Sequence, residues 1–348
     1  MKISIVTMPN VYNCGASLQV FALQEYLKTL GFEVDILNYQ PEYLRHYNIW
    51  RISEKYNKFL LKFLYYGVKI PKRIYSKNFD VKKKQFDSFT SKYLNIGQKK
   101  YLTNEELLDE NISSDIWIVG SDLVWNPELN NGKDPTFFLN FVRIGKKISY
   151  AASIGTRKYT DEKFLRDFDG VSVREKLSVS DLEKYNIKSE YVLDPVILQG
   201  SIFWEQYITK NKNDYVFVYD FENSELINEI VLDIKKRIVR YGDNKKYSPF
   251  DFVENIYNSS IVFTNSFHAM LFSVLFHKNF YVIGRKEHDI NLRMKDFLDN
   301  IGLKDHFISS KEEINNSQID WTKIDNYINN KIEDSKRFLI KNLNWRDN

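Results

Sequence analysis

One histidine stands where a β-strand would give way to a helix, a position suited to acid–base chemistry on an anion. The run 261–263 is β-branched and apolar, 264–266 is small and polar, and the stretch after His268 is compatible with a helix. Open α/β sheets bind ligands at the carboxyl ends of their strands, and a helix start offers free N–H groups to an anion. We therefore expect His268 to face a phosphate or carboxylate and to donate a proton, with Ser266 as a second contact. A hydrogen-bonded structural histidine is the alternative.

Polar residues also follow other predicted strands. Because the carboxyl ends of parallel strands meet at one edge of a sheet, these residues should gather at a cleft between two α/β units. They are Asn13, Gly15, Ser121, Asp122, Ser153, Arg174 and Glu175.

Two of these residues suggest specific roles. Arg174 suits a planar, two-point grip on a carboxylate or phosphate; the alternative is an ion pair with Glu175 or with a neighbouring helix. Asp122 could orient a hydroxyl or act as a base, and its alternative is a local turn or helix cap.

Arg285 and Arg293 follow the last strand of the second unit, where that unit would meet the cleft. The spacing of His277, His288 and Asp289 does not indicate a metal site. The sequence contains no Walker loop, zinc motif or nucleophile elbow, and we predict no metal.

The chain opens with a β-α-β pattern, which favours a parallel sheet. Residues 2–7 alternate as a strand, 16–30 form an amphipathic helix closed by Gly31, and 34–38 form a second strand. The intervening turn has no G-x-G-x-x-G, which argues against a dinucleotide site.

A second β-α series begins near Tyr215, so we predict two Rossmann-like domains facing a cleft, residues 1–195 and 196–348. The helical tail at 320–343 could pack back on the first domain. The remaining predicted strands are 115–120, 147–153, 171–173, 191–193 and 280–283, and the remaining predicted helices are 104–110 and 252–256.

The composition indicates the cellular compartment in which the protein works. The single cysteine, Cys14, excludes an internal disulfide and is expected to be a small buried residue. No apolar run approaches the ~20 residues of a membrane span, and the start lacks a signal-peptide core. These features predict a cytoplasmic protein.

Residues 45–100 form a basic, aromatic insertion. Between 51 and 100 there are fourteen basic and three acidic residues, whereas the whole chain has a net charge of +4. Such a segment suits an anionic membrane surface or a diphosphate-linked lipid, and we expect peripheral association with the inner face of the membrane. The alternatives are nucleic acid, which we do not expect, and a solvated helical insertion.

Six sets of motifs, running in order from near the start to about residue 300, together resemble the polysaccharide pyruvyl transferase family. They are Asn13–Gln19 with Ala22–Gln24, Gly120–Asp122 with Trp125-Asn126, Ser149–Gly155, Ser172–Glu175, Leu193–Val196, and Thr264–His268 with Phe272-Ser273.

The resemblance implies a GT-B-like fold and transfer of a pyruvyl group from phosphoenolpyruvate to two hydroxyls of a sugar. No further cofactor is implied, and the expected acceptor is a polysaccharide or a lipid-linked precursor. The catalytic histidine of the family corresponds to His268 and its arginine to Arg174. We assign Asp122 to catalysis as well. The expected donor contacts are Arg174, Ser266, Asn13, Gly15, Arg285 and Arg293, and the expected acceptor contacts are Ser121, Trp125 and Ser153.

The chain departs from the family at Ser266-Phe267-His268, where some members have Arg-Leu-His. Arg285 or Arg293 would then supply the missing arginine. Two rival functions stay open: a nucleotide-sugar glycosyltransferase on the same fold, and a non-catalytic sugar- or lipid-binding protein.

Overall fold

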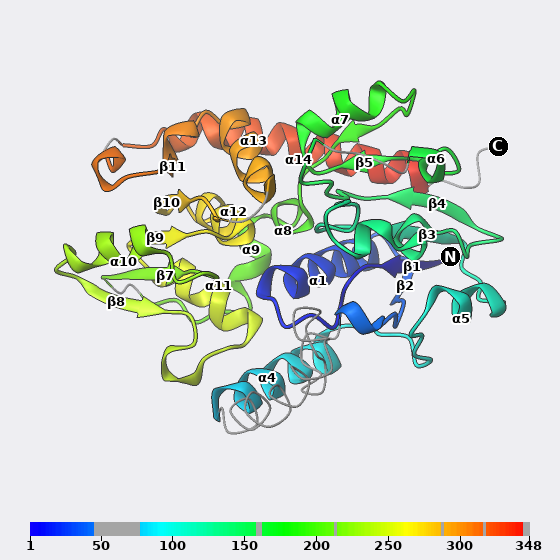
Figure 1. Ribbon diagram of the computed structural model, residues 1–348, viewed down its shortest axis with the longest axis horizontal. Coiled ribbons are helices and arrows are strands. Elements are labelled where there is room, and N and C mark those ends of the chain that lie inside the picture. Colours follow the sequence, from blue (N-terminus) through cyan, green and yellow to red (C-terminus); the bar gives the residue numbers. More distant parts are fainter. Residues whose placement is uncertain (45–76, 158–161, 212–213, 287–288, 316–317, 344–348) are drawn as a thin grey trace, which may run out of the picture.

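The computed structural model describes residues 1–44, 77–157, 162–211, 214–286, 289–315 and 318–343. The chain forms two parallel sheets, one on each side of the view in Figure 1, with helices packed against them. This arrangement confirms the predicted α/β class.

The first sheet has the strand order β2-β1-β3-β4, and all of its strand pairs are parallel. Its central strands are apolar and buried because helices cover both faces of such a sheet. The strands are β1 (Lys2–Val6), β2 (Glu33–Ile36), β3 (Ile116–Val119) and β4 (Lys146–Ser149).

β4 is shorter than the predicted strand 147–153. It ends at Ser149, and Ala151 has a φ of 51°, which interrupts the extended backbone. Isolated bridges then join Ala152 to Asp122 and to Val173, so the predicted residues still meet at one edge. Val173 lies in a two-stranded parallel piece made by β5 (Ser172–Val173) and β6 (Glu190–Tyr191).

Helix α1 (Cys14–Thr29) begins at the turn after β1. The side-chain oxygen of Asn13 accepts hydrogen bonds from the N–H groups of Gly15 and Ala16, which caps the helix. Cys14 is fully buried. The further helices before the second sheet are α4 (Lys77–Tyr93), α5 (Asn104–Asp109), α6 (Glu162–Leu165), α7 (Lys176–Glu183), α8 (Pro195–Leu198) and α9 (Gly200–Glu205).

The second sheet is also parallel, with the order β11-β10-β9-β7-β8. The sequence analysis did not find β8, whose ends are charged, or β11, which has two residues. The strands are β7 (Tyr215–Tyr219), β8 (Arg237–Arg240), β9 (Ile261–Thr264), β10 (Asn279–Ile283) and β11 (Phe307–Ile308). The helices are α10 (Glu225–Leu232), α11 (Pro249–Asn258), α12 (Phe267–Leu275), α13 (Leu292–Asn300) and α14 (Trp321–Leu343).

The two sheets share one apolar core. The ring of Trp204 lies 6.1 Å from Phe21 of α1 and 5.0 Å from Phe272 of α12, measured between ring centroids. A polar contact adds to this packing, because Asp296 of α13 accepts hydrogen bonds from the first N–H groups of α7. Helices that cover the two sheets are thereby packed against one another.

The long helix α14 runs back along the first part of the chain (Figure 1). The hydroxyl oxygen of Ser335 accepts a hydrogen bond from the N–H of Leu193, and Asn342 lies against Gly170. At its other end, Asp325 pairs with His277, 2.8 Å away. The helix therefore contacts both parts of the chain, and the division at 195/196 stays a prediction.

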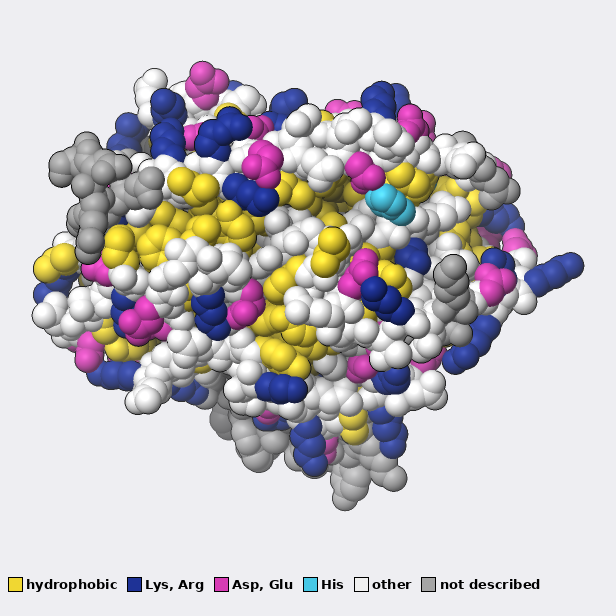
Figure 2. All heavy atoms as spheres, turned by 180° about the vertical axis from the view of Figure 1, so that it is seen from behind, with side chains coloured by type: hydrophobic (Ala, Val, Ile, Leu, Met, Phe, Trp, Pro, Cys, Tyr) yellow, Lys and Arg dark blue, Asp and Glu magenta, His cyan; other side chains and the backbone are white. Residues whose placement is uncertain are grey.

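The basic insertion is described from residue 77 onward, and residues 45–76 lie outside the described part. Gln85 of α4 bonds to the backbone of Lys245 and Tyr247, so this helix contacts the loop after β8. On the face turned away from the viewer in Figure 1, basic and acidic side chains are intermingled (Figure 2). No helix among the described residues is long and apolar enough to span a bilayer.

Candidate active site

The carboxyl ends of β1, β3, β5 and β9 point to one region between the two sheets. α12 follows β9 directly, and α13 approaches the same region through its first turn. The polar residues brought together there are Asp122, Arg174, Glu175, Asp194, His268 and Arg293.

His268 lies in the first turn of α12, as predicted. Ser266 caps this helix, because its hydroxyl oxygen accepts a hydrogen bond from the N–H of Ala269. The imidazole is 5% exposed and packs directly against Gly15 of α1. The turn after β1 and the start of α12 therefore position the ring from opposite sides.

Asp194 is the shared partner of the two residues that the sequence analysis singled out first. Its Oδ2 lies 2.8 Å from Arg174 Nη1 and 3.5 Å from His268 Nε2. The Ser121 hydroxyl donates to the same oxygen over 3.1 Å. Burial would raise the pKa of Asp194, but His268 and Arg174 outweigh it and hold the pKa far below its ordinary value. Asp194 is therefore a fixed negative charge between a cation and an imidazole.

Asp122 connects this cluster to the two arginines. Its Oδ1 lies 3.4 Å from Arg293 Nη1 and 3.6 Å from Arg174 Nη2. Burial tends to raise its pKa, but attraction to Arg174, His268 and Arg293 leaves the pKa below its ordinary value. The Asp122 carboxylate also accepts a hydrogen bond from the N–H of Leu123. This contact is local, as the alternative interpretation of Asp122 as a turn or cap residue expected. Asp122 is thus ionised near neutral pH.

The two arginines differ in how fully they are neutralised. Both stack on the ring of Phe267, with the guanidinium carbon at 4.3 Å for Arg174 and 5.2 Å for Arg293. Burial alone would lower the pKa of Arg174, but Asp194, Asp122 and Glu175 raise it. Burial and repulsion from Arg174 instead lower the pKa of Arg293 to about 10. Arg293 is therefore the cation that an incoming anion would stabilise most.

Several nitrogen atoms of the cluster lack hydrogen-bond partners within the described part of the chain. They are Nε and Nη2 of Arg174, Nε of Arg293 and Nε2 of His268, all of which are buried. Carboxylate oxygens lie 3.5–3.7 Å from three of these atoms, too far for good hydrogen bonds. Leaving a buried polar group unpaired costs about 1–3 kcal/mol, so such a concentration indicates a site for an acceptor-rich ligand.

A hollow of about 470 Å³ opens beside this cluster, and Asp122 lies in its wall. Its other walls come from the turn after β1, the loop after β3, the short 3₁₀ helix η1 (Glu42–Leu44), α4 and the loop after β7. The residues that line it include Tyr12, Tyr43, Lys82, Asp122, Asn130 and Phe221. Asp122 therefore faces both the cation cluster and an open space.

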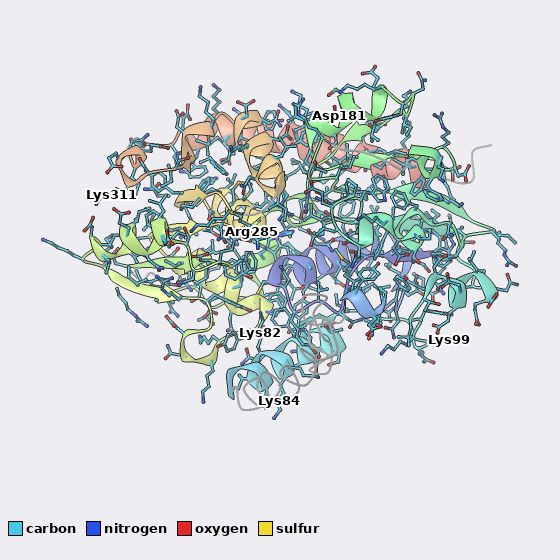
Figure 3. The ribbon with its side chains drawn as sticks, in the orientation of Figure 1. Lys82, Lys84, Lys99, Asp181, Arg285 and Lys311 are labelled. Atoms are coloured by element: carbon cyan, nitrogen blue, oxygen red, sulfur yellow. The ribbon has the colours of Figure 1, made fainter. Side chains whose placement is uncertain are left out.

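Arg285 is placed apart from the buried cluster. Its guanidinium pairs with Glu222 at 2.9 Å and lies over the ring of Phe221 at 4.9 Å. In Figure 3 it lies where the two sheets approach each other. Of the two arginines offered as substitutes for the missing family arginine, Arg293 is the one that contacts Asp122.

The three predicted acceptor contacts are buried, and their role in binding an acceptor stays a prediction. Trp125 is 1% exposed, and its indole N–H donates to the carbonyl of Phe137. Ser121 and Ser153 have no exposed surface, and the Ser153 hydroxyl donates to Glu175. These side chains stabilise the loops beneath the site.

Asp194 is the most important residue that the sequence analysis missed. The predicted strand 191–193 stops just before Asp194, and Asp194 caps α8 by accepting a hydrogen bond from the N–H of Val196. Its other carboxylate oxygen nevertheless faces Arg174 and His268. The motif Leu193–Val196 was a signal that this aspartate does more than end a strand.

A family-level comparison agrees with the resemblance found in the sequence. The model of a family described as polysaccharide pyruvyl transferase matches residues 13–287, more than half of the chain. A comparison with curated proteins finds no match.

Solved structures resemble the fold at low sequence identity. A candidate UDP-N-acetylglucosamine 2-epimerase from Listeria monocytogenes is 11% identical, with a TM-score of 0.51 over 97% of this chain and 89% of that one. The glycosyltransferase SnogD from Streptomyces nogalater is 9% identical, with a TM-score of 0.44 over 98% and 99%. An uncharacterised Klebsiella pneumoniae protein is 17% identical, with a TM-score of 0.43 over 67% and 88%. The first similarity bears on the fold alone, which is GT-B-like, as predicted.

Proposed function

Because this chain belongs to the polysaccharide pyruvyl transferase family, we propose that it transfers the pyruvyl group of phosphoenolpyruvate to two hydroxyls of one sugar, forming a cyclic ketal and releasing phosphate. The observation that carries the proposal is the group of buried, unpartnered nitrogen atoms on Arg174, Arg293 and His268 beside an open hollow. Phosphoenolpyruvate carries a carboxylate and a phosphate, whose oxygens are suitable acceptors for these donors.

We assign the main donor contact to Arg293. Arg174 already faces Asp194, Asp122 and Glu175, whereas Arg293 has one carboxylate contact among the described residues, at Asp122. An anion that binds Arg293 is attracted strongly, because the positive charge of this buried guanidinium is poorly neutralised by the protein. Arg174 then holds Asp194 and Asp122 in place and presents its remaining N–H groups to the same ligand.

His268 supplies the proton that starts the reaction. Protonation of the methylene carbon of phosphoenolpyruvate makes the central carbon cationic, and a sugar hydroxyl adds to that carbon. Asp122 accepts the proton of the attacking hydroxyl; although its lowered pKa makes it a weak base, bonding to a cationic carbon makes that hydroxyl strongly acidic. The bond from the central carbon to the phosphate oxygen then breaks.

The second hydroxyl of the sugar adds to the same carbon and closes the ring. One hydroxyl proton replaces the proton spent on the methylene carbon, and the other leaves with phosphate. One phosphoenolpyruvate and one diol thus give one ketal and one phosphate. The proposed steps use side chains and the co-substrate, so a chelator should not change the rate.

Phosphate release from phosphoenolpyruvate, measured against a panel of chromophore-linked and lipid-linked sugars, tests the proposal. Stoichiometric phosphate together with a product of the mass of a pyruvyl ketal would support it. Transfer from a nucleotide sugar without phosphate release from phosphoenolpyruvate would instead show a glycosyltransferase. Sugar binding without turnover of either donor would show a binding protein.

We also propose where in the cell the reaction takes place. A lipid-linked acceptor would bring the protein to the inner surface of the membrane, where the basic residues of α4 would meet anionic lipids. Co-sedimentation with vesicles should increase with the fraction of anionic lipid. Binding that does not depend on lipid charge would contradict this localisation.

A further inference from the structure

We infer that a hollow at the carboxyl end of α12 is a second ligand site, which binds a small molecule with a phosphate or carboxylate group and an apolar body. Its volume of about 770 Å³ falls within the range of about 300–1,000 Å³ typical of small-molecule pockets. Its walls come from α8, α9, the ends of α11 and α12, and the first half of α14. The inference goes beyond the proposed function and does not depend on it.

This hollow and the candidate active site lie at opposite ends of α12. His268 is the second residue of the helix, whereas Val274 and Leu275 from its last turn line the hollow. At a rise of 1.5 Å per residue, Leu275 lies about 10 Å along the helix from His268. Arg174 and Arg293 are not part of the wall either. A ligand bound there would therefore leave the donor contacts free.

Lys278 places a half-buried positive charge in the wall of the hollow. Its ammonium group donates to the carbonyl of Ser259 over 3.2 Å and lies 5.3 Å from the centre of the Tyr257 ring. Within the described part of the chain this ammonium forms no ion pair, and burial lowers its pKa. Lysine has three N–H donors, so the bond to Ser259 leaves donors for a ligand. An anion in the hollow would stabilise this charge.

Both carboxylates of the wall already have partners. Glu205 pairs with Lys210 at 2.5 Å, and Asp325 pairs with His277 at 2.8 Å. Neither of them pairs with Lys278. An anionic group that enters the hollow therefore reaches an ammonium for which no carboxylate of the wall competes, and at short range the attraction between opposite charges favours its binding.

Apolar side chains form much of the remaining wall. They include Leu275, Phe276, Ile328 and Ile332. The ring of Phe276 meets that of Tyr257 edge-on, with 5.1 Å between the centroids, so the surface next to Lys278 is aromatic. Pockets of this kind combine apolar walls with a few polar groups that orient the ligand. The expected ligand therefore carries an apolar ring or chain on its anionic group.

Calorimetric titration of the full chain with three probes tests the inference. The probes are 4-nitrophenyl phosphate, 4-nitrobenzoate and the neutral 4-nitrobenzyl alcohol. We expect Lys278→Met to weaken binding of both anions about tenfold, equal to about 1.4 kcal/mol, and to change that of the neutral probe less than about twofold. Thermal unfolding checks that the variant folds. A loss confined to one of the anions also supports the site and identifies the group that it prefers.

Lys163→Met is the matched control, because it removes the same charge from α6, outside the hollow. The ammonium of Lys163 also lies near an aromatic ring, 5.1 Å from the centre of Phe164. This variant should bind all probes as the wild type does. Equal losses for Lys163→Met and Lys278→Met, or for the neutral and the charged probes, would overturn the role of Lys278.

A second pair of variants tests the hollow itself. Asn329 is exposed on α14 and lines the hollow, whereas the next residue, Asn330, is exposed and does not. Asn329→Trp should fill the space and weaken binding of all three probes, and Asn330→Trp should not. Unchanged binding to Asn329→Trp would remove the hollow as the site.

Arg293→Ala separates this site from the donor contacts. Binding of the anions to the hollow should be unchanged in this variant. Anion binding that is lost with Arg293→Ala but kept with Lys278→Met would place the probes in the candidate active site and overturn the inference.

Discussion

Gly15 and His268 are packed so closely that any side chain at position 15 would collide with the imidazole. A β-carbon built on Gly15 would lie 2.0 Å from His268 Nδ1 and 2.4 Å from its Cγ. Glycine is therefore required at position 15 because it has no side chain. An unusual backbone angle is not the reason. The turn that starts α1 sets the position of the imidazole at the start of α12.

Gly15→Ala should displace the imidazole and impair catalysis more than donor binding. A ring moved by 1 Å or more loses its alignment with the substrate, and such displacements can cost about a hundredfold in rate. We expect kcat to fall about a hundredfold and KM for phosphoenolpyruvate to change less than tenfold. Gly97→Ala is the control, because its new methyl group would make an ordinary contact at 3.5 Å. Equal kinetics for the two variants would show that the packing has no catalytic role.

His268→Ala tests the imidazole itself. A general acid contributes typically ~10²–10⁴-fold, so kcat should fall at least a hundredfold while the fold is kept. Phosphate release at saturating donor measures the loss, and circular dichroism checks the fold. Turnover near the wild-type rate would remove His268 from the mechanism.

Arg293 and Arg174 should respond differently to truncation. Hydrogen bonds to charged groups contribute about 1.5–3 kcal/mol, so Arg293→Ala should raise KM for the donor about 10- to 100-fold. Arg174→Ala removes the partner of Asp194 and should lower stability by about 3–5 kcal/mol as well. Donor titrations and urea unfolding separate the two effects. Stability losses of equal size would contradict the distinction between a paired and a poorly compensated arginine.

The ionisation of Asp194 makes the free energy of unfolding decrease as the pH falls. Its pKa in the folded protein is lower than the ordinary value of 3.8, so its contribution is complete well above pH 4 and is lost as the pH falls. In that acid range the unfolded chain takes up a proton before the folded one does. The free energy of unfolding should therefore fall with pH below about 4 in the wild type.

Asp194→Asn should weaken this dependence. The variant removes the carboxylate nearest to Arg174 and should be less stable near neutral pH, and the difference in unfolding free energy from the wild type should shrink as the pH falls below about 4. Urea unfolding at several pH values measures the difference. The exposed Asp299→Asn serves as the control. A difference that stays constant with pH would show that Asp194 is not the linked group.

The sheet edge could be predicted because parallel topology places strand ends together wherever polar residues follow apolar runs. On that basis Asp122 and Arg174 are expected near one edge, and the facing arrangement of the two predicted units brings His268 to them. The choice between Arg285 and Arg293 could not be made from the sequence, because Glu222, 63 residues before Arg285, binds its guanidinium. Such partners depend on tertiary distances that no local pattern contains.

Trp125 shows a second limit of sequence reasoning. Trp125 was assigned as an acceptor contact because it belongs to a motif that carries the family resemblance. The loop after β3 instead turns the indole inward, where it stacks on Phe138 at 5.9 Å and donates to a buried carbonyl. A motif places a residue in a segment but does not fix the direction of its side chain.

Trp125→Phe separates the two interpretations of this residue. Phenylalanine keeps an aromatic ring but leaves the carbonyl of Phe137 without its indole donor, and an unpaired buried acceptor costs about 1–3 kcal/mol. We expect lower stability in urea and KM values for acceptor and donor within about twofold of the wild type, because the ring is 1% exposed. Unchanged stability together with an acceptor KM raised tenfold would place Trp125 in contact with the sugar after all. That result would require the loop after β3 to turn outward when the acceptor binds.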